Sequence, residues 1–427
     1  MENRYDKYKD SGIAWIGEIP EHWELRKGKN LFKLRNSKGN NNAILLAATQ
    51  KYGMIPQSQV EGVVQVKQNT DLNTFKTVHK NDYVISLRSF QGGFEMSEYE
   101  GVCSPAYQVF YSTKPCCNYF FKYMFKSYGF VSQINAFTLG IREGKNIQYE
   151  DFSLMKLPLP TIQEQQSIAT YLDQKCSEID ELITLQEGMI TKLQSYKQSV
   201  ITETVTKGLN KNVPLKDSGI EWIGEIPEHW ICTVFKKFLS EPMQYGANEP
   251  AEECNYNDPR YIRITDIKDD GTLRDDTFKS LPLEKAKEYM LTKGDLLFAR
   301  SGATVGKTFL YKEDYAACFA GYLIKARCNK NELLPNFIFY YTLSNAYQNW
   351  KNSIFIQSTI QNIGADKYSV MPIIAPPLSE QQSIANYLDQ KCSEIDELIS
   401  IKQQKIEKLK DYKKSLIFEC VTGKRKV

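Results

Sequence analysis

The sequence predicts a mixed α/β fold in which two α+β domains are joined by two long antiparallel coiled-coil helices. Two near-identical repeats support this prediction. DSGIAWIGEIPEHW at residues 10–23 returns at 217–230 with one substitution, and EQQSIATYLDQKCSEIDELI at 164–183 returns at 380–399, also with one. The blocks between these repeats share little sequence. The chain is therefore an internal duplication with a pseudo-twofold axis, the intramolecular counterpart of a symmetric dimer.

The length of 427 residues allows roughly two or three domains. We expect four segments in the chain. They are a first domain at 1–160, a first long helix at 161–208, a second domain at 209–376 and a second long helix at 377–427.

The short repeat that opens each half contains apolar residues that we expect to form a clasp. The clasp would seat each domain on the helical frame or on a bound partner, and the alternative is that it faces DNA. Its apolar members are Trp15, Ile16, Ile19, Pro20 and Trp23 in the first copy, and Trp222, Ile223, Ile226, Pro227 and Trp230 in the second.

The long helices have recognisable ends. The tetrapeptides 161–164 and 379–382 both fit the capping-box pattern of Ser or Thr followed three residues later by Glu or Gln. Gly208 and Gly423 lie where a helix end is expected. Each helix would then run for about 44 residues, or about 65 Å.

A heptad pattern of apolar residues runs along both helices, and it favours packing of one helix against the other. The alternative is that each helix packs only on its own domain. Polar residues at 186, 402, 197 and 413 interrupt the seam and could fix its register. The seam consists of Leu172, Cys176, Ile179, Ile183, Ile190, Leu193 and Val200, and of Leu388, Cys392, Ile395, Ile399, Ile406, Leu409 and Leu416.

Each variable block contains a clear strand followed by a basic loop with glycines. The strands are expected at Asp82–Leu87 and Asp295–Ala299, and the loops are 88–93 and 300–307. A second polar stretch lies near the end of each block.

Arg, Lys, Gln and Asn side chains can read base edges in the DNA major groove, although any one such loop could be an ordinary solvated loop. The candidate DNA contacts are Arg88, Ser89, Gln91, Arg142, Lys145, Asn146, Arg300, Ser301, Thr304, Lys307, Gln357, Ser358, Gln361 and Asn362.

No pattern in the chain predicts catalysis or a metal site. Histidine occurs only at 22, 79 and 229, and we expect structural roles at 22 and 229 because they are one repeat position. Residues 301–308 (SGATVGKT) nearly match a phosphate-binding P-loop but begin with Ser in place of Gly, and the segment that follows does not resemble a helix.

The formal net charge of +3 neither requires nor excludes a nucleic-acid partner. The N-terminus lacks an apolar signal region and no apolar run is long enough for a membrane helix, so we expect a cytoplasmic protein without membrane contact. The ten cysteines are then expected as free thiols.

The two short repeats, the run from Pro158 to Ile183 with its copy from Pro376 to Ile399, and the phrase FARSGATVGK at 298–307 closely resemble the DNA-specificity subunit of type I restriction-modification enzymes. The resemblance covers essentially the whole chain. It implies that each variable block is a target recognition domain that reads half of a split double-stranded DNA site. The helices would act as a ruler and a docking platform.

The same resemblance implies a non-catalytic chain without cofactors. Two modification (methyltransferase) subunits would bind S-adenosylmethionine and methylate adenine, and restriction/translocase subunits would use ATP and Mg²⁺. A partner that the clasp binds would then be a modification subunit. The alternative is a coiled-coil scaffold whose variable blocks bind proteins.

Overall fold

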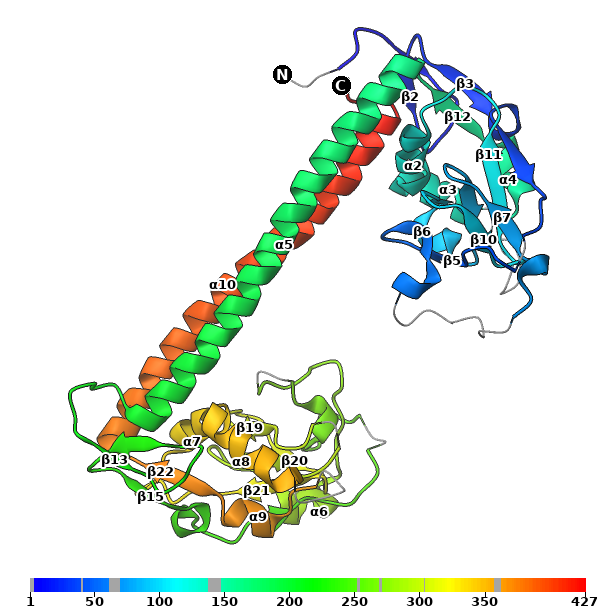
Figure 1. Cartoon of the computed structure of the whole chain (residues 1–427). Coiled ribbons are helices and arrows are strands. Elements are labelled where there is room, and N and C mark those ends of the chain that lie inside the picture. Colours follow the sequence, from blue (N-terminus) through cyan, green and yellow to red (C-terminus); the bar gives the residue numbers. More distant parts are fainter. Residues whose placement is uncertain are drawn as a thin grey trace. The chain divides into compact units, whose positions relative to one another are not determined.

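The computed structural model divides into two compact units, each built from one variable block and parts of both long helices. Unit 1 comprises Met1–Glu187 and Gln403–Val427, and unit 2 comprises Gly188–Lys402. Helices α5 (Ile162–Lys207) and α10 (Leu378–Val421) are continuous and contribute to both units (Figure 1). The described residues are 4–39, 41–60, 70–136, 147–251, 254–268, 271–302, 304–356 and 362–427.

A four-stranded antiparallel sheet with strand order β4-β11-β8-β9 forms the centre of unit 1. The strand expected at Asp82–Leu87 is present as β8 but is shorter. Asp82 instead closes the preceding turn, because its carboxylate accepts hydrogen bonds from the His79 N–H and from Arg35. The sheet consists of β4 (Phe32–Arg35), β11 (Gln108–Ser112), β8 (Tyr83–Ile85) and β9 (Glu95–Met96).

Four two-stranded antiparallel pairs and several short helices surround this sheet. The pairs are β1 (Tyr8–Asp10) with β2 (Glu18–Pro20), β3 (Glu24–Lys27) with β12 (Lys156–Leu159), β5 (Leu46–Thr49) with β6 (Gly53–Pro56), and β7 (Lys76–Val78) with β10 (Gly101–Cys103). The helices are η1 (Gly28–Asn30), η2 (Gln57–Gln59), η3 (Leu72–Thr74), α1 (Ser89–Gly92), α2 (Asn118–Lys126), α3 (Tyr128–Ala136) and α4 (Tyr149–Leu154).

Unit 2 repeats this design with a sheet of order β16-β21-β18-β19. Strand β18 confirms the strand expected at Asp295–Ala299, although it begins one residue later. A parallel pair, β17 with β20, is an addition to the shared plan. The sheet consists of β16 (Gln244–Tyr245), β21 (Leu323–Ala326), β18 (Leu296–Ala299) and β19 (Thr308–Leu310).

The remaining described elements of unit 2 are as follows. The strands are β13 (Leu215–Asp217), β14 (Glu225–Pro227), β15 (Ile231–Val234), β17 (Arg260–Ile262), β20 (Ala317–Phe319) and β22 (Pro372–Ala375). The helices are η4 (Phe235–Phe238), η5 (Ile264–Asp266), α6 (Leu283–Ala286), η6 (Lys287–Tyr289), α7 (Pro335–Thr342), α8 (Asn345–Ile356) and α9 (Ala365–Ser369).

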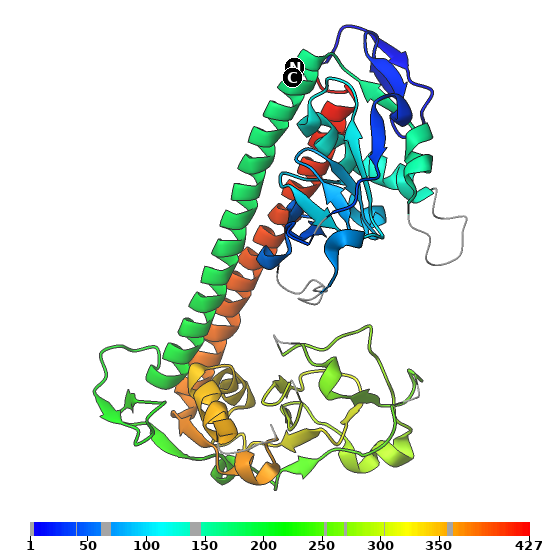
Figure 2. The ribbon, with the colours of Figure 1, turned by 45° about the vertical axis from the view of Figure 1, so that its right-hand side comes forward.

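Within each unit the two long helices pack side by side and antiparallel, as both views show (Figures 1 and 2). The predicted seam is confirmed: its residues are buried or half-buried. In unit 1, Leu172 of α5 and Leu416 of α10 share one core cluster with Phe110 of the variable block. The alternative in which each helix packs only on its own domain is therefore wrong. Within the described ranges, none of the helices combines the length and apolar character needed to cross a bilayer.

Two lysines that interrupt the seam form ion pairs between the helices. Lys413 contacts Asp180 at 2.6 Å in unit 1, and Lys197 contacts Asp396 at 2.7 Å in unit 2. The four residues occupy two repeat positions, so each unit contains the same pair with the helix roles exchanged. An opposite charge at one place on the facing helix favours this register over its alternatives.

The helix ends agree only in part with the sequence pattern. Thr161 and Glu164 form the expected capping box, with the Thr161 N–H donating to Glu164 at 3.1 Å and the Glu164 N–H donating to the Thr161 hydroxyl. The box expected at 379–382 is wrong, because α10 already begins at Leu378. The position equivalent to Thr161 is Pro377, which has no hydroxyl to accept the bond.

The clasp packs on the frame in both units. The Trp23 indole N–H donates to Glu164 at 3.2 Å, and the Trp230 indole N–H donates to Glu380 at 3.0 Å. Both tryptophans are fully buried. The neighbouring histidines contact the same carboxylates, His22 at 2.8 Å and His229 at 2.7 Å, which confirms their expected structural role.

Each clasp also contacts the end of the other long helix. Gly423 follows α10 and lies against Trp23, while Gly208 follows α5 and lies against Trp230. Both glycines have positive φ angles, 74° and 76°, as expected for residues that terminate a helix. The clasp therefore joins the start of one helix to the end of its partner in each unit.

Candidate nucleic-acid interface

The loop after β8 places two of the candidate DNA contacts on the surface of unit 1. Arg88 and Gln91 are exposed. Ser89 is buried, and its hydroxyl accepts a hydrogen bond from the Ser86 N–H at 2.8 Å, so it stabilises the turn. Exposed Phe90 adds an apolar contact surface beside Arg88. The loop therefore presents a guanidinium, an amide and an aromatic ring to solvent.

The glycines of this loop serve packing. Gly93 has a φ of 80°, and a Cβ at this position would lie 1.9 Å from the carbonyl oxygen of Phe125. At Gly92, a Cβ would lie 3.0 Å from Cγ of Gln50. These glycines let the loop lie close to α2 and to the β5–β6 turn.

The β5–β6 turn and the loop after β8 enclose a hollow of about 520 Å³, here called the hairpin hollow. Its exposed polar lining comes from these two segments and from η2. Gln50 Nε2 donates to Gln91 Oε1 at 3.4 Å across the hollow. The exposed lining residues are Gln50, Lys51, Tyr52, Gln59, Arg88 and Gln91. Sequence reasoning found only the last two.

The electrostatics of the hairpin hollow favour an anionic or polar ligand. Among the described residues that line it, the single carboxylate is Glu95, which is buried and paired with Lys126 at 2.5 Å. Burial raises the pKa of Glu95 and lowers the pKa of Lys126. Lys51 and Arg88 contribute exposed positive charge to the rim.

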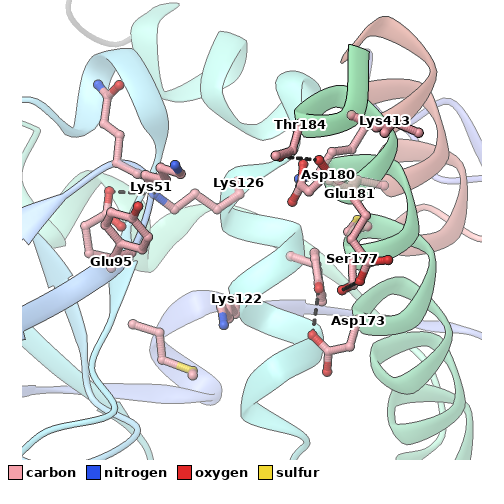
Figure 3. Close-up of a pocket in the computed structure, with 18 residues that line it drawn as sticks. Lys51, Glu95, Lys122, Lys126, Asp173, Ser177, Asp180, Glu181, Thr184 and Lys413 are labelled. Carbon is pink, nitrogen blue, oxygen red and sulfur yellow. Dashed lines mark hydrogen bonds and ion pairs between the residues drawn. The ribbon is translucent and has the colours of Figure 1, made fainter. Parts of the chain in front are cut away.

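A second hollow of about 920 Å³ lies between the block and the helices of unit 1 (Figure 3). Lys51, Lys122 and Lys126 lie on the block side, while Asp173, Asp180 and Glu181 lie on α5. Many of these charges are already satisfied, for example by the bond from Tyr123 to Asp173 at 2.6 Å and by the cross-helix pair of Asp180. Polar contacts beside this hollow, such as that from Tyr123 to Asp173, therefore join the variable block to the long helices.

Arg300 occupies the place in unit 2 that corresponds to Arg88. It follows β18 directly, and its guanidinium carbon lies 4.8 Å from the ring centroid of Tyr245. The Tyr245 hydroxyl accepts a hydrogen bond from the Ala365 N–H at 3.0 Å, which fixes the ring. Arg300 Nε is buried without a partner among the described residues. The arginine is thus held by stacking.

The other candidates in this loop are half-buried. Ser301 forms an isolated β-bridge with Asn362, which is itself exposed, and Thr304 accepts a hydrogen bond from the Lys307 N–H at 3.0 Å. Thr308 begins strand β19, so the segment lacks the helix that a P-loop requires.

Six further candidates lie outside the described residues: Arg142, Lys145, Asn146, Gln357, Ser358 and Gln361.

Both units expose apolar side chains at the same repeat positions of the long helices. Leu182 and its equivalent Leu398 are 44% and 46% exposed, and Leu185 and its equivalent Ile401 are 53% and 51% exposed. A helix surface in water normally carries polar residues here. The exposed apolar residues on the long helices are therefore repeated between the two units.

The part of the chain that the structure describes contains no group of three or more His, Cys, Asp or Glu residues arranged to hold a metal ion.

Comparison with known proteins identifies one family. The model for the type I restriction modification DNA specificity domain matches residues 20–194 and 244–411. The MjaVIII specificity subunit of Methanocaldococcus jannaschii is 27% identical over 67% of this chain and 66% of that protein. The putative MjaX specificity subunit of the same organism is 25% identical over 96% of both chains.

Two solved structures share the fold. One, described as the structural basis of complex assembly and conformational transition of the type I R-M system, aligns with a TM-score of 0.70 at 15% identity, over 94% of this chain and 98% of that chain. The HsdS subunit of Thermoanaerobacter tengcongensis aligns with a TM-score of 0.53 at 16% identity, over 95% and 98%.

Proposed function

This chain belongs to the type I restriction-modification DNA specificity family, and we propose that its two units read two different halves of one split double-stranded DNA site. Unit 1 reads one half through the hairpin hollow and the loop that carries Arg88. Unit 2 reads the other half through the loop that carries Arg300. The segment of DNA between the half-sites is not read.

The observation that carries this proposal is the contrast between a repeated frame and divergent reading surfaces. The clasp tryptophans and the cross-helix ion pairs make the same contacts in both units. The surfaces near the two arginines differ: Arg88 is exposed beside a pair of glutamines, whereas Arg300 is stacked on a tyrosine. Equivalent supports with different readers suit an asymmetric, bipartite target.

Sequence reading and affinity arise from different contacts. Arg, Gln and Asn side chains discriminate bases through hydrogen bonds in the major groove. Lysines such as Lys51 contact phosphates and contribute affinity without sequence information. Binding therefore weakens as salt concentration rises, because each phosphate contact releases counterions.

The modification subunits dock on the long helices. The exposed pair Leu182 and Leu185 in unit 1 repeats as Leu398 and Ile401 in unit 2, so two identical subunits would meet equivalent surfaces. These subunits supply S-adenosylmethionine and adenine methylation. Restriction/translocase subunits supply ATP- and Mg²⁺-dependent cleavage, and this chain directs both activities without catalysing either.

Exchange of the variable block tests this proposal. Residues 232–376 are replaced by the corresponding block of another family member, and the complex with the modification subunits then methylates DNA in cells. We expect one half of the methylated sequence to change and the other half to persist. A methylated sequence that is unchanged by the exchange would refute the reading role of the block. A complex that no longer forms after the exchange would instead place partner binding in the blocks.

A further inference from the structure

The side chains of Gln50 and Gln91, here called the amide pair, join two segments that are far apart in the sequence. Gln50 follows β5, and Gln91 lies in α1 after β8. Both side chains are exposed and line the hairpin hollow. One amide N–H of Gln50 donates to the Gln91 oxygen. Among the described residues, this leaves the amino group of Gln91, and the oxygen and second amide N–H of Gln50, available to a ligand.

The surrounding residues hold the amide pair in place. The side chain of Gln50 lies against Gly92, where any Cβ would approach its Cγ to 3.0 Å. Lys126 donates to the backbone oxygen of Gln50 at 3.3 Å and also pairs with buried Glu95 at 2.5 Å (Figure 3). The turn that carries Gln50 is therefore fixed to α2 and β9 before any ligand binds, as a reading site requires.

Building on the proposed function, we propose that the amide pair reads an adenine in the half-site bound by unit 1. In the major groove adenine presents the N7 acceptor beside the N6 amino donor. The unused donor of Gln91 suits N7, and the unused oxygen of Gln50 suits the amino group.

Guanine at the same position would be rejected. Guanine presents two acceptors, N7 and O6, so its O6 would face the Gln50 oxygen with no hydrogen between the two atoms. Arg88, on the same hollow, offers only donors and suits a neighbouring guanine. The amide pair, which presents a donor beside an acceptor, and Arg88, which presents only donors, thus discriminate between the two purines.

Residue replacement in the full complex tests the amide pair. The chain, assembled with its modification subunits, methylates a library of duplexes randomised at each position of the unit 1 half-site, and the methylated products are sequenced. Gln50→Ala and Gln91→Ala should each reduce the preference for adenine over guanine at one position by roughly 5- to 150-fold. The double variant should lose little more than either single variant, because the two amides act as one unit.

Three controls separate the outcomes. Gln174→Ala removes an amide of the same unit that bonds Glu178 on α5 and lies outside the hollow, so it should leave the preference intact. Gln91→Glu keeps the side-chain size but removes the unused donor, and it should lose the preference as Gln91→Ala does. An unchanged unit 2 half-site in the same molecules shows that each variant is folded and assembled.

The amide-pair proposal is overturned if Gln50→Ala and Gln91→Ala retain the full adenine preference while the wild type still reads a split site. Failure of the proposed function has a different signature, namely methylation without any sequence dependence in the wild-type complex.

Discussion

The indole hydrogen bond of the clasp offers a quantitative test of the duplicated frame. Trp23→Phe keeps most of the buried ring but removes the N–H that donates to Glu164 at 3.2 Å. A hydrogen bond to a charged group contributes about 1.5–3 kcal/mol. Glu164 keeps its bonds to His22 and Thr161, so it is not left unpaired, and we expect a loss near the lower end, about 2 kcal/mol.

Trp230→Phe is the matched variant in unit 2. Its bond to Glu380 is 3.0 Å long, and that carboxylate retains His229. Glu380 has fewer other partners than Glu164 but is more exposed, with 40% against 23% of its side chain accessible, so water can replace the lost donor. These differences oppose each other, and the two variants should destabilise their own units equally, to within about 1 kcal/mol.

Hydrogen exchange monitored by mass spectrometry resolves the two units. Each Phe variant should lower protection at the start of one helix and the end of the other within its own unit. Trp23→Ala should cost more, about 3–5 kcal/mol, because it also empties a buried site. A loss below about 0.5 kcal/mol for either Phe variant, or equal loss of protection in both units from one variant, would refute the clasp mechanism.

Three further predictions concern helix ends, acid and salt. Gly423→Ala should lower the thermal unfolding temperature more than Gly208→Ala, because both have positive φ but the Cβ at 423 would lie only 2.3 Å from Pro20, against 3.0 Å for the nearest atom at 208. Burial raises the pKa of Glu164, but hydrogen bonds such as that from His22 outweigh burial and hold this pKa below its usual value. The stabilisation that ionised Glu164 contributes is therefore present above about pH 4.3 and is lost as pH falls through the lower folded-state pKa. Glu164→Gln should therefore make the unfolding temperature depend less on pH between about pH 3 and 5. The logarithm of DNA affinity should fall linearly with the logarithm of salt concentration, and a salt-independent affinity would exclude phosphate contacts.

The frame could be predicted from sequence because its determinants are local and duplicated. Apolar spacing identified the seam, and Gly208 and Gly423 identified the C-terminal end of each long helix. The error at Ser379 has a physical cause. The capping pattern was matched two residues past Pro377, the residue that precedes α10 and stands in the place of Thr161 without a hydroxyl. Alignment of the two repeats, which pairs Glu164 with Glu380, locates that start correctly.

The candidate interface was predicted less completely because it depends on contacts between distant segments. The basic loop after a strand predicted Arg88 and Gln91, and the structure places both in the lining of the hairpin hollow. Gln50 was not predicted, since nothing in Gln-Lys-Tyr-Gly indicates that this turn meets the loop forty residues later. The same pattern predicted Ser89, which the structure buries and whose hydroxyl stabilises the turn.

The sequence of methylated sites tests the central claim most directly. The complete chain is produced with its modification subunits in cells that lack other adenine methylation, and methylated positions are read by single-molecule sequencing. Two units with different reading surfaces predict two different short half-sequences separated by a gap of fixed length in which every base occurs. A single uninterrupted sequence, or two identical half-sequences, would contradict the account.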